Sequence, residues 1–293
     1  MTIHTILTHP GGAHRDEFLA CAVLAAIHGC RIVRREPGGE DLADPGVAVV
    51  DVGGEHDPAR SNFDHHQFGV DGPLWCALSL VLMDLGLYED ARAFCEWLET
   101  AERFDVTGPN ETAAWLGVDR ALLAKLNSAV DVTLMRRFAR AREVMPGEAL
   151  HEVMTWVGED LLIYLRTMRE RMDHLDVHAE IREAMGWKVL FLPRTDPLPD
   201  EPSAGIGRYL EGKGLAGEVV ALVYPDRRGS GYGLSRHEDH PAFDFTRIAA
   251  EQDVHFAHAR GFVAKTSATD EGRLWELLAA AATRPGDSEG GEV

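Results

Sequence analysis

The chain has 293 residues, which is enough for roughly two domains with a well-developed core. Its 48 acidic residues outnumber its 29 basic residues, so the formal net charge is -19 at pH 7. This charge excludes a protein that coats long nucleic acids, because such binding depends on neutralised phosphates, but it is compatible with a short oligonucleotide or a small phosphoester.

The first part of the chain predicts a strand, a helix and a second strand. Residues 3–8 form a short apolar run, residues 18–28 are rich in alanine and leucine, and residues 46–52 form a valine-rich run. A continuous apolar run of this kind is typical of a strand buried in a parallel sheet. Sites in such sheets form beyond the carboxyl ends of the strands.

Three clusters of metal-competent side chains follow these elements. His9 follows the first strand, with His14 and Asp16 close behind; Asp51 lies in the second apolar run; and Asp64-His65-His66 comes after a glycine turn. Taken singly, each histidine could be a surface residue, and Asp16 or Glu17 could be a first-turn helix acid. A buried Asp51, however, needs a partner. Together the clusters predict a metal site.

The middle of the chain, from about residue 74 to residue 185, is predicted to be helical. Apolar positions recur at helical spacing in residues 77–85, 91–101, 121–130, 133–142 and 151–172. Four arginines, Arg136, Arg137, Arg140 and Arg142, could bind phosphate. At this spacing they are more typical of a solvated face with local ion pairs, which is the interpretation we favour.

After Gly186 the pattern changes to alternating strands and turns. We expect strands at residues 187–192, 218–224, 231–236 and 261–265, the start of a helix at residues 204–210, and a helix over residues 245–252. The composition shift and a proline-rich segment place a domain boundary here. We therefore predict a catalytic domain over residues 1–183, a smaller domain over residues 184–284, and a disordered tail over residues 285–293.

The cysteines and the hydropathy indicate a reduced, non-membrane setting. Cys21, Cys30, Cys76 and Cys95 show no C-x-x-C spacing and lie in or beside apolar stretches, so we expect buried thiols without a disulfide framework. The chain has neither a basic-then-apolar leader nor an apolar run of about 18 residues. The expected location is the cytoplasm.

The motifs resemble those of a known superfamily. The pattern from His9 to Asp16, then residues 50–54, Asp57-Pro58 and residues 63–67 (Phe-Asp-His-His-Gln), resembles the DHH phosphoesterases. Within them it is most similar to the melanocyte-proliferating-gene branch, which is also described as metal-dependent protein hydrolases and understood as exonuclease-like. The resemblance implies an α/β fold: a parallel-sheet DHH-type domain with a helical middle region, plus a smaller C-terminal α/β substrate-binding domain.

The resemblance also implies two divalent ions, typically manganese. His9 and His14 would hold one ion, Asp16 and His65 the other, and Asp51 would bridge them. A further aspartate comes from a fourth motif, for which we choose Asp105 over Glu102. His66 would face the substrate phosphate as a donor or acid, with Asp64 orienting a histidine. Imidazole at position 14, where many members have aspartate, makes manganese, iron, cobalt or zinc more plausible than magnesium alone.

The C-terminal part resembles the substrate-binding domain of oligoribonuclease-like members. Arg236 lies on the strand that corresponds to one bearing a substrate-contacting arginine, and residues 255–262 resemble a degenerate glycine-rich loop that lacks the triple glycine. We expect Arg236, His258, Arg260, Gly261 and Lys265 to form a locally basic wall for a terminal phosphate or the penultimate nucleotide. The alternative is that Arg236 and Arg260 pair with surface carboxylates.

These expectations combine into a metal-dependent phosphodiesterase, an exonuclease on short RNA or DNA, in which a cleft between domains restricts entry to chain ends. Two alternatives stay open. One is a small-molecule phosphoesterase acting on a nucleoside bisphosphate or a cyclic dinucleotide. The other is a non-catalytic nucleotide-binding regulator. A homodimer is compatible with the sequence.

Overall fold

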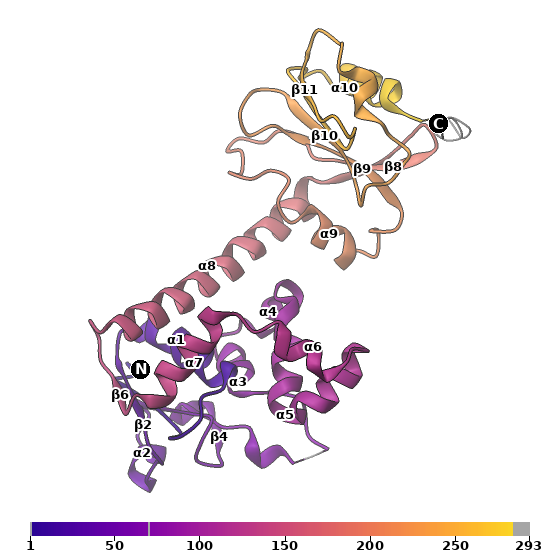
Figure 1. The fold of residues 1–293 in the computed structure, drawn as a ribbon. Coiled ribbons are helices and arrows are strands. Elements are labelled where there is room, and N and C mark those ends of the chain that lie inside the picture. Colours follow the sequence, from indigo (N-terminus) through magenta and orange to yellow (C-terminus); the bar gives the residue numbers. More distant parts are fainter. Residues whose placement is uncertain (1, 70, 284–293) are drawn as a thin grey trace. The chain divides into compact units, whose positions relative to one another are not determined.

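The computed structural model describes residues 2–69 and 71–283 (Figure 1). It has a mixed α/β fold with two sheets, and it divides into two compact units, residues 1–167 and residues 168–293. The division falls inside the helix α8 (Ala149–His178). The predicted tail, residues 285–293, lies outside the described residues.

Short β-branched runs build the sheet of the first unit. Its strand order is β4-β5-β3-β1-β2-β6. The bounds are β1 (Thr5–Thr8), β2 (Arg31–Arg34), β3 (Val47–Val50), β4 (His56–Asp57), β5 (Asn62–Phe63) and β6 (Glu143–Val144). The strands β2, β1, β3 and β5 run parallel, whereas the edge strands β4 and β6 are antiparallel. The predicted strands β1 and β3 are present, and the sheet as a whole is mixed.

Helices make up most of the remaining first unit, as its apolar periodicity predicts. They are α1 (Arg15–His28), α2 (Gly39–Ala43), α3 (Ala77–Asp84), α4 (Tyr88–Phe94), α5 (Glu96–Leu116), α6 (Arg120–Lys125) and α7 (Ala129–Arg140), with the 3-10 turns η1 (Pro58–Arg60) and η2 (His66–Phe68). Gly108 has φ 80°, and with Pro109 it divides α5 into two helical pieces. The predicted helix over residues 91–101 is interrupted at Cys95.

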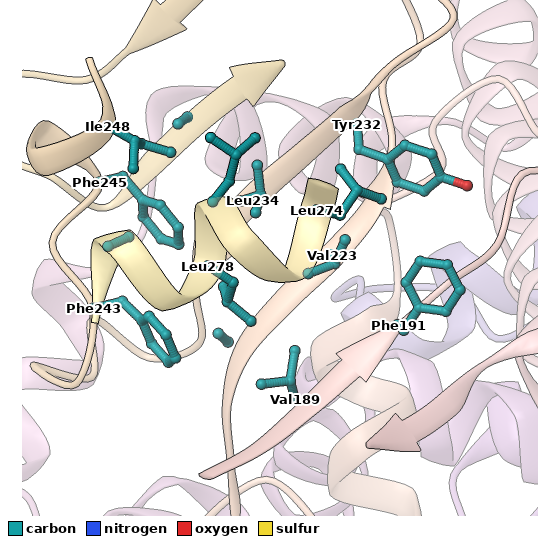
Figure 2. Packing of buried hydrophobic residues seen from close by; sticks show 14 of the residues in the cluster. Val189, Phe191, Val223, Tyr232, Leu234, Phe243, Phe245, Ile248, Leu274 and Leu278 are labelled. Carbon is teal, nitrogen blue, oxygen red and sulfur yellow. The ribbon is translucent and has the colours of Figure 1, made fainter. Parts of the chain in front are cut away.

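The second unit has its own sheet, ordered β11-β12-β10-β9-β8-β7. The bounds are β7 (Glu180–Ala184), β8 (Trp187–Phe191), β9 (Val219–Pro225), β10 (Tyr232–Arg236), β11 (Val254–Ala257) and β12 (Val263–Thr266), with α9 (Ile206–Gly212), η3 (Phe245–Ile248) and α10 (Glu271–Ala281). Only β8 and β9 pair in parallel among these strands. Leu274 and Leu278 of α10 pack on the sheet together with the aromatic rings of Phe243 and Phe245 (Figure 2).

Parts of several predicted helical regions are wrong, including residues 126–128 within the predicted helix 121–130 and the strand β6 within the predicted helical middle. Residues 180–184 form β7 rather than helix, because backbone pairing with β8 overrides a weak local preference. The predicted helix at residues 245–252 is only the short turn η3, which the Asp244 carboxylate caps by accepting from Thr246 N at 3.0 Å. Because β7 is hydrogen-bonded to β8, the second unit includes residues on both sides of the predicted boundary at 183/184.

The cysteine prediction is confirmed, since the four thiols are free and buried. Over residues 2–69 and 71–283, the structure contains no helix that is long and apolar enough to cross a membrane.

The helices α1 and α8 approach closely at Gly158. A Cβ atom added there would lie 2.2 Å from the carbonyl oxygen of Ala22. We predict that Gly158→Ala lowers the free energy of unfolding by about 2 kcal/mol, because the helices must separate. The measurement is chemical denaturation followed by circular dichroism. The matched control is Gly207→Ala in α9, where an added Cβ meets nothing within 4 Å; it should be neutral or stabilising by about 0.5–1 kcal/mol.

Candidate metal centre

The first ligand candidates follow the ends of two neighbouring strands and lie at one edge of the sheet. Thr8 and Val50 are register partners at the ends of β1 and β3, so His9 and Asp51 leave the sheet side by side. Asp51 has φ 57°, a left-handed conformation that is uncommon for a residue with a side chain. Its backbone N–H donates to Phe63 O at 3.1 Å, which helps to hold this turn. Such conformations cluster at functional sites.

Asp51 occupies the centre of the site. Its Oδ1 lies 3.0 Å from His65 Nε2, and its Oδ2 lies 3.5 Å from His9 Nε2. The carboxylate is 2% exposed. Each oxygen thus faces a different histidine, an arrangement that suits a carboxylate bridging two positions.

One group of potential ligands consists of Asp16, Asp51, His65 and Asp105, with one ligand atom from each lying within 4.8 Å of the others. Each of these residues has a buried polar atom that makes no well-formed hydrogen bond in the described structure: Asp16 Oδ1, Asp51 Oδ1, His65 Nε2 and Asp105 Oδ2. His65 Nε2 lies 3.0 Å from both Asp51 Oδ1 and Asp105 Oδ2, so three of these atoms are close neighbours. Buried polar atoms normally have a partner, so four such atoms from one group are exceptional. A divalent cation would satisfy all four, and their mix of carboxylate and imidazole is a common donor set for one.

The electrostatics of this group also favour a cation. Burial raises the pKa of Asp16 well above its usual value, and the charges of Asp51 and Asp105 raise it further. Burial opposes protonation of His65, but the Asp105 and Asp51 carboxylates outweigh it and raise the pKa of His65 to about 10. Without a metal, this group therefore retains protons that a bound cation would displace.

A second group contains His9, His14, Glu17 and Asp51. The Asp51 and Glu17 carboxylates raise the pKa of His9 to about 10. Asp105 Oδ1 lies 3.5 Å from His14 Nδ1 and raises the pKa of His14. The two groups thus contain the predicted pairs, His9 with His14 and Asp16 with His65, and share Asp51.

Sequence reasoning missed Glu17 as a member of the site. This carboxylate is fully buried, contacts His9 Nε2, accepts from Arg34 Nη2 at 2.8 Å and accepts from His14 N at 3.4 Å. The available signal was Arg34, a charged residue directly after the apolar pair Ile32-Val33. A buried guanidinium requires a buried carboxylate partner.

The structure separates the two candidates in the fourth motif. Asp105 lies in the cluster, with Oδ2 at 3.0 Å from His65 Nε2. Glu102 is instead satisfied elsewhere: it accepts hydrogen bonds from Ser79 Oγ at 2.7 Å, Tyr88 OH at 2.9 Å and Arg92 Nη1 at 2.9 Å. The geometry therefore favours Asp105 as the ligand and gives Glu102 a structural role.

His66 lies at the exposed rim of the group. Its Nδ1 is 2.7 Å from Asp64 Oδ1, and its side chain is 62% exposed. Asp64 is buried and also accepts from the backbone N–H of His66 at 3.1 Å. Asp64 therefore fixes the orientation of His66, which also forms a third group of potential ligands with Asp51 and His65.

The predicted substrate residues of the second unit have different environments. Arg236 donates from Nε to Phe243 O at 2.5 Å, and a Cβ added at Gly261 would lie 3.2 Å from its Nη2. Lys265 is held by the buried Asp226 at 2.7 Å. The His258 ring lies against Phe262, and Arg260 is exposed. Arg236 and Gly261 are thus neighbours, while Lys265 is engaged in an ion pair.

Comparisons with known proteins agree with the resemblance of the N-terminal segment. Residues 5–73 match the family model MYG1_exonuc, described as an uncharacterised protein family (UPF0160). This confirms the predicted resemblance to the exonuclease-like branch over that segment.

Curated relatives match the same part of the chain. MYG1 exonucleases of Homo sapiens and Bos taurus are each 53% identical to it over 64 residues, which cover 20% of this chain and 16% of each relative. The matched region is thus about one sixth of these relatives' length.

Solved structures give only a distant likeness. A pGpG-specific phosphodiesterase, PggH from Vibrio cholerae, has a TM-score of 0.34 at 12% identity, covering 96% of this chain and all of that one. RecJ in complex with Mn²⁺ from Thermus thermophilus has a TM-score of 0.27 at 14% identity, covering 94% and 51%. Scores this low establish no shared overall fold.

The roles of Asp105 and Glu102 can be separated by matched substitutions. We predict that Asp105→Asn loses at least one bound metal equivalent, because it removes a charged ligand, while Glu102→Gln retains the wild-type metal content. The measurement is metal content after loading with Mn²⁺ and dialysis. Metal loss in Glu102→Gln without loss in Asp105→Asn would reverse the assignment.

Asp16 gives a second prediction. Because its pKa is raised in the folded protein, its ionisation at neutral pH opposes folding when no metal is bound. Asp16→Asn should therefore raise the melting temperature of the metal-free protein by a few degrees, since about 1 kcal/mol corresponds to roughly 2–4 °C for a domain of 150–250 residues. The same variant should lose the stabilisation that Mn²⁺ gives the wild type. Thermal unfolding with Mn²⁺ or chelator measures both effects, and a destabilised metal-free variant would contradict the prediction.

Proposed function

We propose that the protein is a divalent-metal-dependent phosphodiesterase that removes nucleotides from the ends of short RNA or DNA oligonucleotides. The observation that carries this proposal is the convergence of four buried ligand atoms that make no well-formed hydrogen bond, one each from Asp16, Asp51, His65 and Asp105. The match of residues 5–73 to an exonuclease family supports the reaction class.

Two divalent ions, with manganese as the first candidate, fit the two groups that share Asp51. His9 and His14 would hold one ion, Asp16 and His65 the other, with Asp105 completing the second group and Glu17 supporting His9. When bound, such ions polarise a phosphoryl group and activate water for in-line attack. The carboxylates and imidazoles of the chain would hold that pair of charges in a buried, preorganised position.

The remaining residues would act on the substrate itself. His66, fixed by Asp64, would donate a hydrogen bond or a proton to an oxygen of the scissile phosphate. In the second unit, Arg236 beside Gly261, with His258 and Arg260, would contact a phosphate or base of the substrate. Lys265 would contribute less, because Asp226 neutralises much of its charge.

The test uses two substrates, a generic phosphodiester and a 5′-labelled short RNA, each with Mn²⁺ or chelator. Asp51→Ala and His65→Ala are compared with the wild type. Metal-dependent laddering that is lost in both variants would support the exonuclease. Turnover of the generic ester without laddering would favour a small-molecule phosphoesterase, to be pursued with nucleoside bisphosphates and cyclic dinucleotides. Neither activity would favour a nucleotide-binding regulator.

His66 provides a finer prediction. We expect His66→Ala to lower kcat about 10²- to 10³-fold, the range for loss of a general acid or phosphate donor, while metal content stays at the wild-type level. Asp64→Asn should lower kcat in the same direction, because it weakens the hydrogen bond that orients the ring. Steady-state kinetics paired with metal analysis separates this outcome from loss of the metal centre itself.

A further inference from the structure

A basic groove lies beside the loop that carries the first metal ligand. It has a volume of about 510 Å³, within the range of ligand sites, and its lining includes Pro10, Gly11, Arg34, Arg35, Arg140 and Arg142. Pro10 and Gly11 directly follow His9, so one rim of the groove is the ligand loop itself. The opposite rim is the end of α7 and the segment that follows it.

The two arginines on that opposite rim are unpaired. Arg140 and Arg142 are exposed, and neither has a side-chain hydrogen bond or an ion pair within residues 2–69 and 71–283. The expected local ion pairs are therefore missing at these positions. Arg35 differs, because Asp41 binds it through two hydrogen bonds of 2.8 and 2.9 Å. The groove also contains one carboxylate, that of Glu143.

The floor of the groove is a buried cation linked to the metal centre. The Arg34 side chain is 1% exposed, its Nη2 donates to Glu17 Oε1 at 2.8 Å and to Gly12 O at 2.9 Å, and its Nη1 donates to Phe138 O at 2.7 Å. Arg34 thus holds the ligand loop and α7 in place, while the exposed guanidinium groups of Arg140 and Arg142 are the donors that an anionic ligand in the groove can reach.

We infer that this groove binds a backbone phosphate of a single-stranded oligonucleotide whose end is at the metal centre. Guanidinium groups bind phosphate oxygens in pairs, and two unpaired arginines supply that geometry without a competing ion pair. The groove thereby gives a chain of net charge -19 a local positive site for its substrate. This inference rests on the proposed phosphodiesterase function. It assigns a contact with the oligonucleotide backbone to the first unit.

The test compares Arg140→Gln/Arg142→Gln with the matched control Arg120→Gln/Arg137→Gln. Both double variants remove two exposed arginines of the first unit that have no ion pair within the described ranges, but Arg120 and Arg137 do not line this groove. The groove variant should raise KM for a short labelled RNA about tenfold or more, because charged hydrogen bonds to phosphate are lost. Its kcat/KM for a generic phosphodiester should match that of the control.

A binding measurement that does not depend on catalysis tests the groove separately from the proposed phosphodiesterase activity. In chelator, fluorescence anisotropy of a 5′-fluorescein-labelled short RNA should show weaker binding for the groove variant, with a salt slope reduced by about 0.7 for each lost phosphate contact. The control should keep the wild-type affinity and slope.

Three outcomes decide the matter. If the groove variant has the same RNA affinity and KM as the control, the proposal that the groove binds the oligonucleotide is wrong. Equal loss on RNA and on the generic ester would also overturn it, because the substitutions would then be acting through the ligand loop. If the wild type cleaves neither substrate but the groove variant alone loses RNA binding, the phosphodiesterase proposal fails and the binding groove stands.

Discussion

The site depends on one constraint, which is that two buried carboxylates and one largely enclosed carboxylate surround His65 with too few well-formed hydrogen bonds. Asp16 and Asp51 are each 2% exposed, and Asp105 is confined beside them. Burying unpaired charge is costly unless protons or cations compensate it. In the metal-free chain, protons on His9 and His65 provide part of this compensation. The fold thus concentrates negative charge that a divalent cation can neutralise. Without the cation, this charge lowers the stability of the protein.

Arg34 connects that charge to the rest of the first unit. It contacts Glu17 on α1, Gly12 in the ligand loop and Phe138 on α7, and its guanidinium lies 4.4 Å from the centre of the Phe138 ring. One buried side chain therefore holds the ligand loop, the helix that supplies Asp16, and the helix that borders the basic groove. Because Arg34 contacts all three elements, a shift of α7 would also disturb the candidate metal ligands.

The sequence predicts the parts of the site that depend on strand ends. His9 and Asp51 follow valine- and isoleucine-rich runs whose parallel pairing brings them together, and the motif Asp64-His65-His66 lies near them. Glu17 was missed because its contacts with Arg34 and His9 join α1, β2 and the ligand loop, which only the folded structure brings together. Asp105 and Glu102 are indistinguishable by composition, and only the network around Ser79 and Tyr88 separates them. In the second unit, pairing with β8 makes a strand of residues 180–184, which local preference predicted as helix, and the helix predicted at residues 245–252 is only the turn η3.

The charge distribution bears on which substrates such a centre can accept. Salt screens exposed charges beyond about 8 Å at physiological ionic strength, so a phosphate in the groove would experience Arg140 and Arg142 rather than the net charge of the whole chain. Phosphates farther along the oligonucleotide would have no comparable contact with this groove and would lie near a predominantly acidic protein. Each added nucleotide would then contribute little attraction and some repulsion. A short basic groove on an acidic chain consequently favours short oligonucleotides over long ones, without any steric barrier.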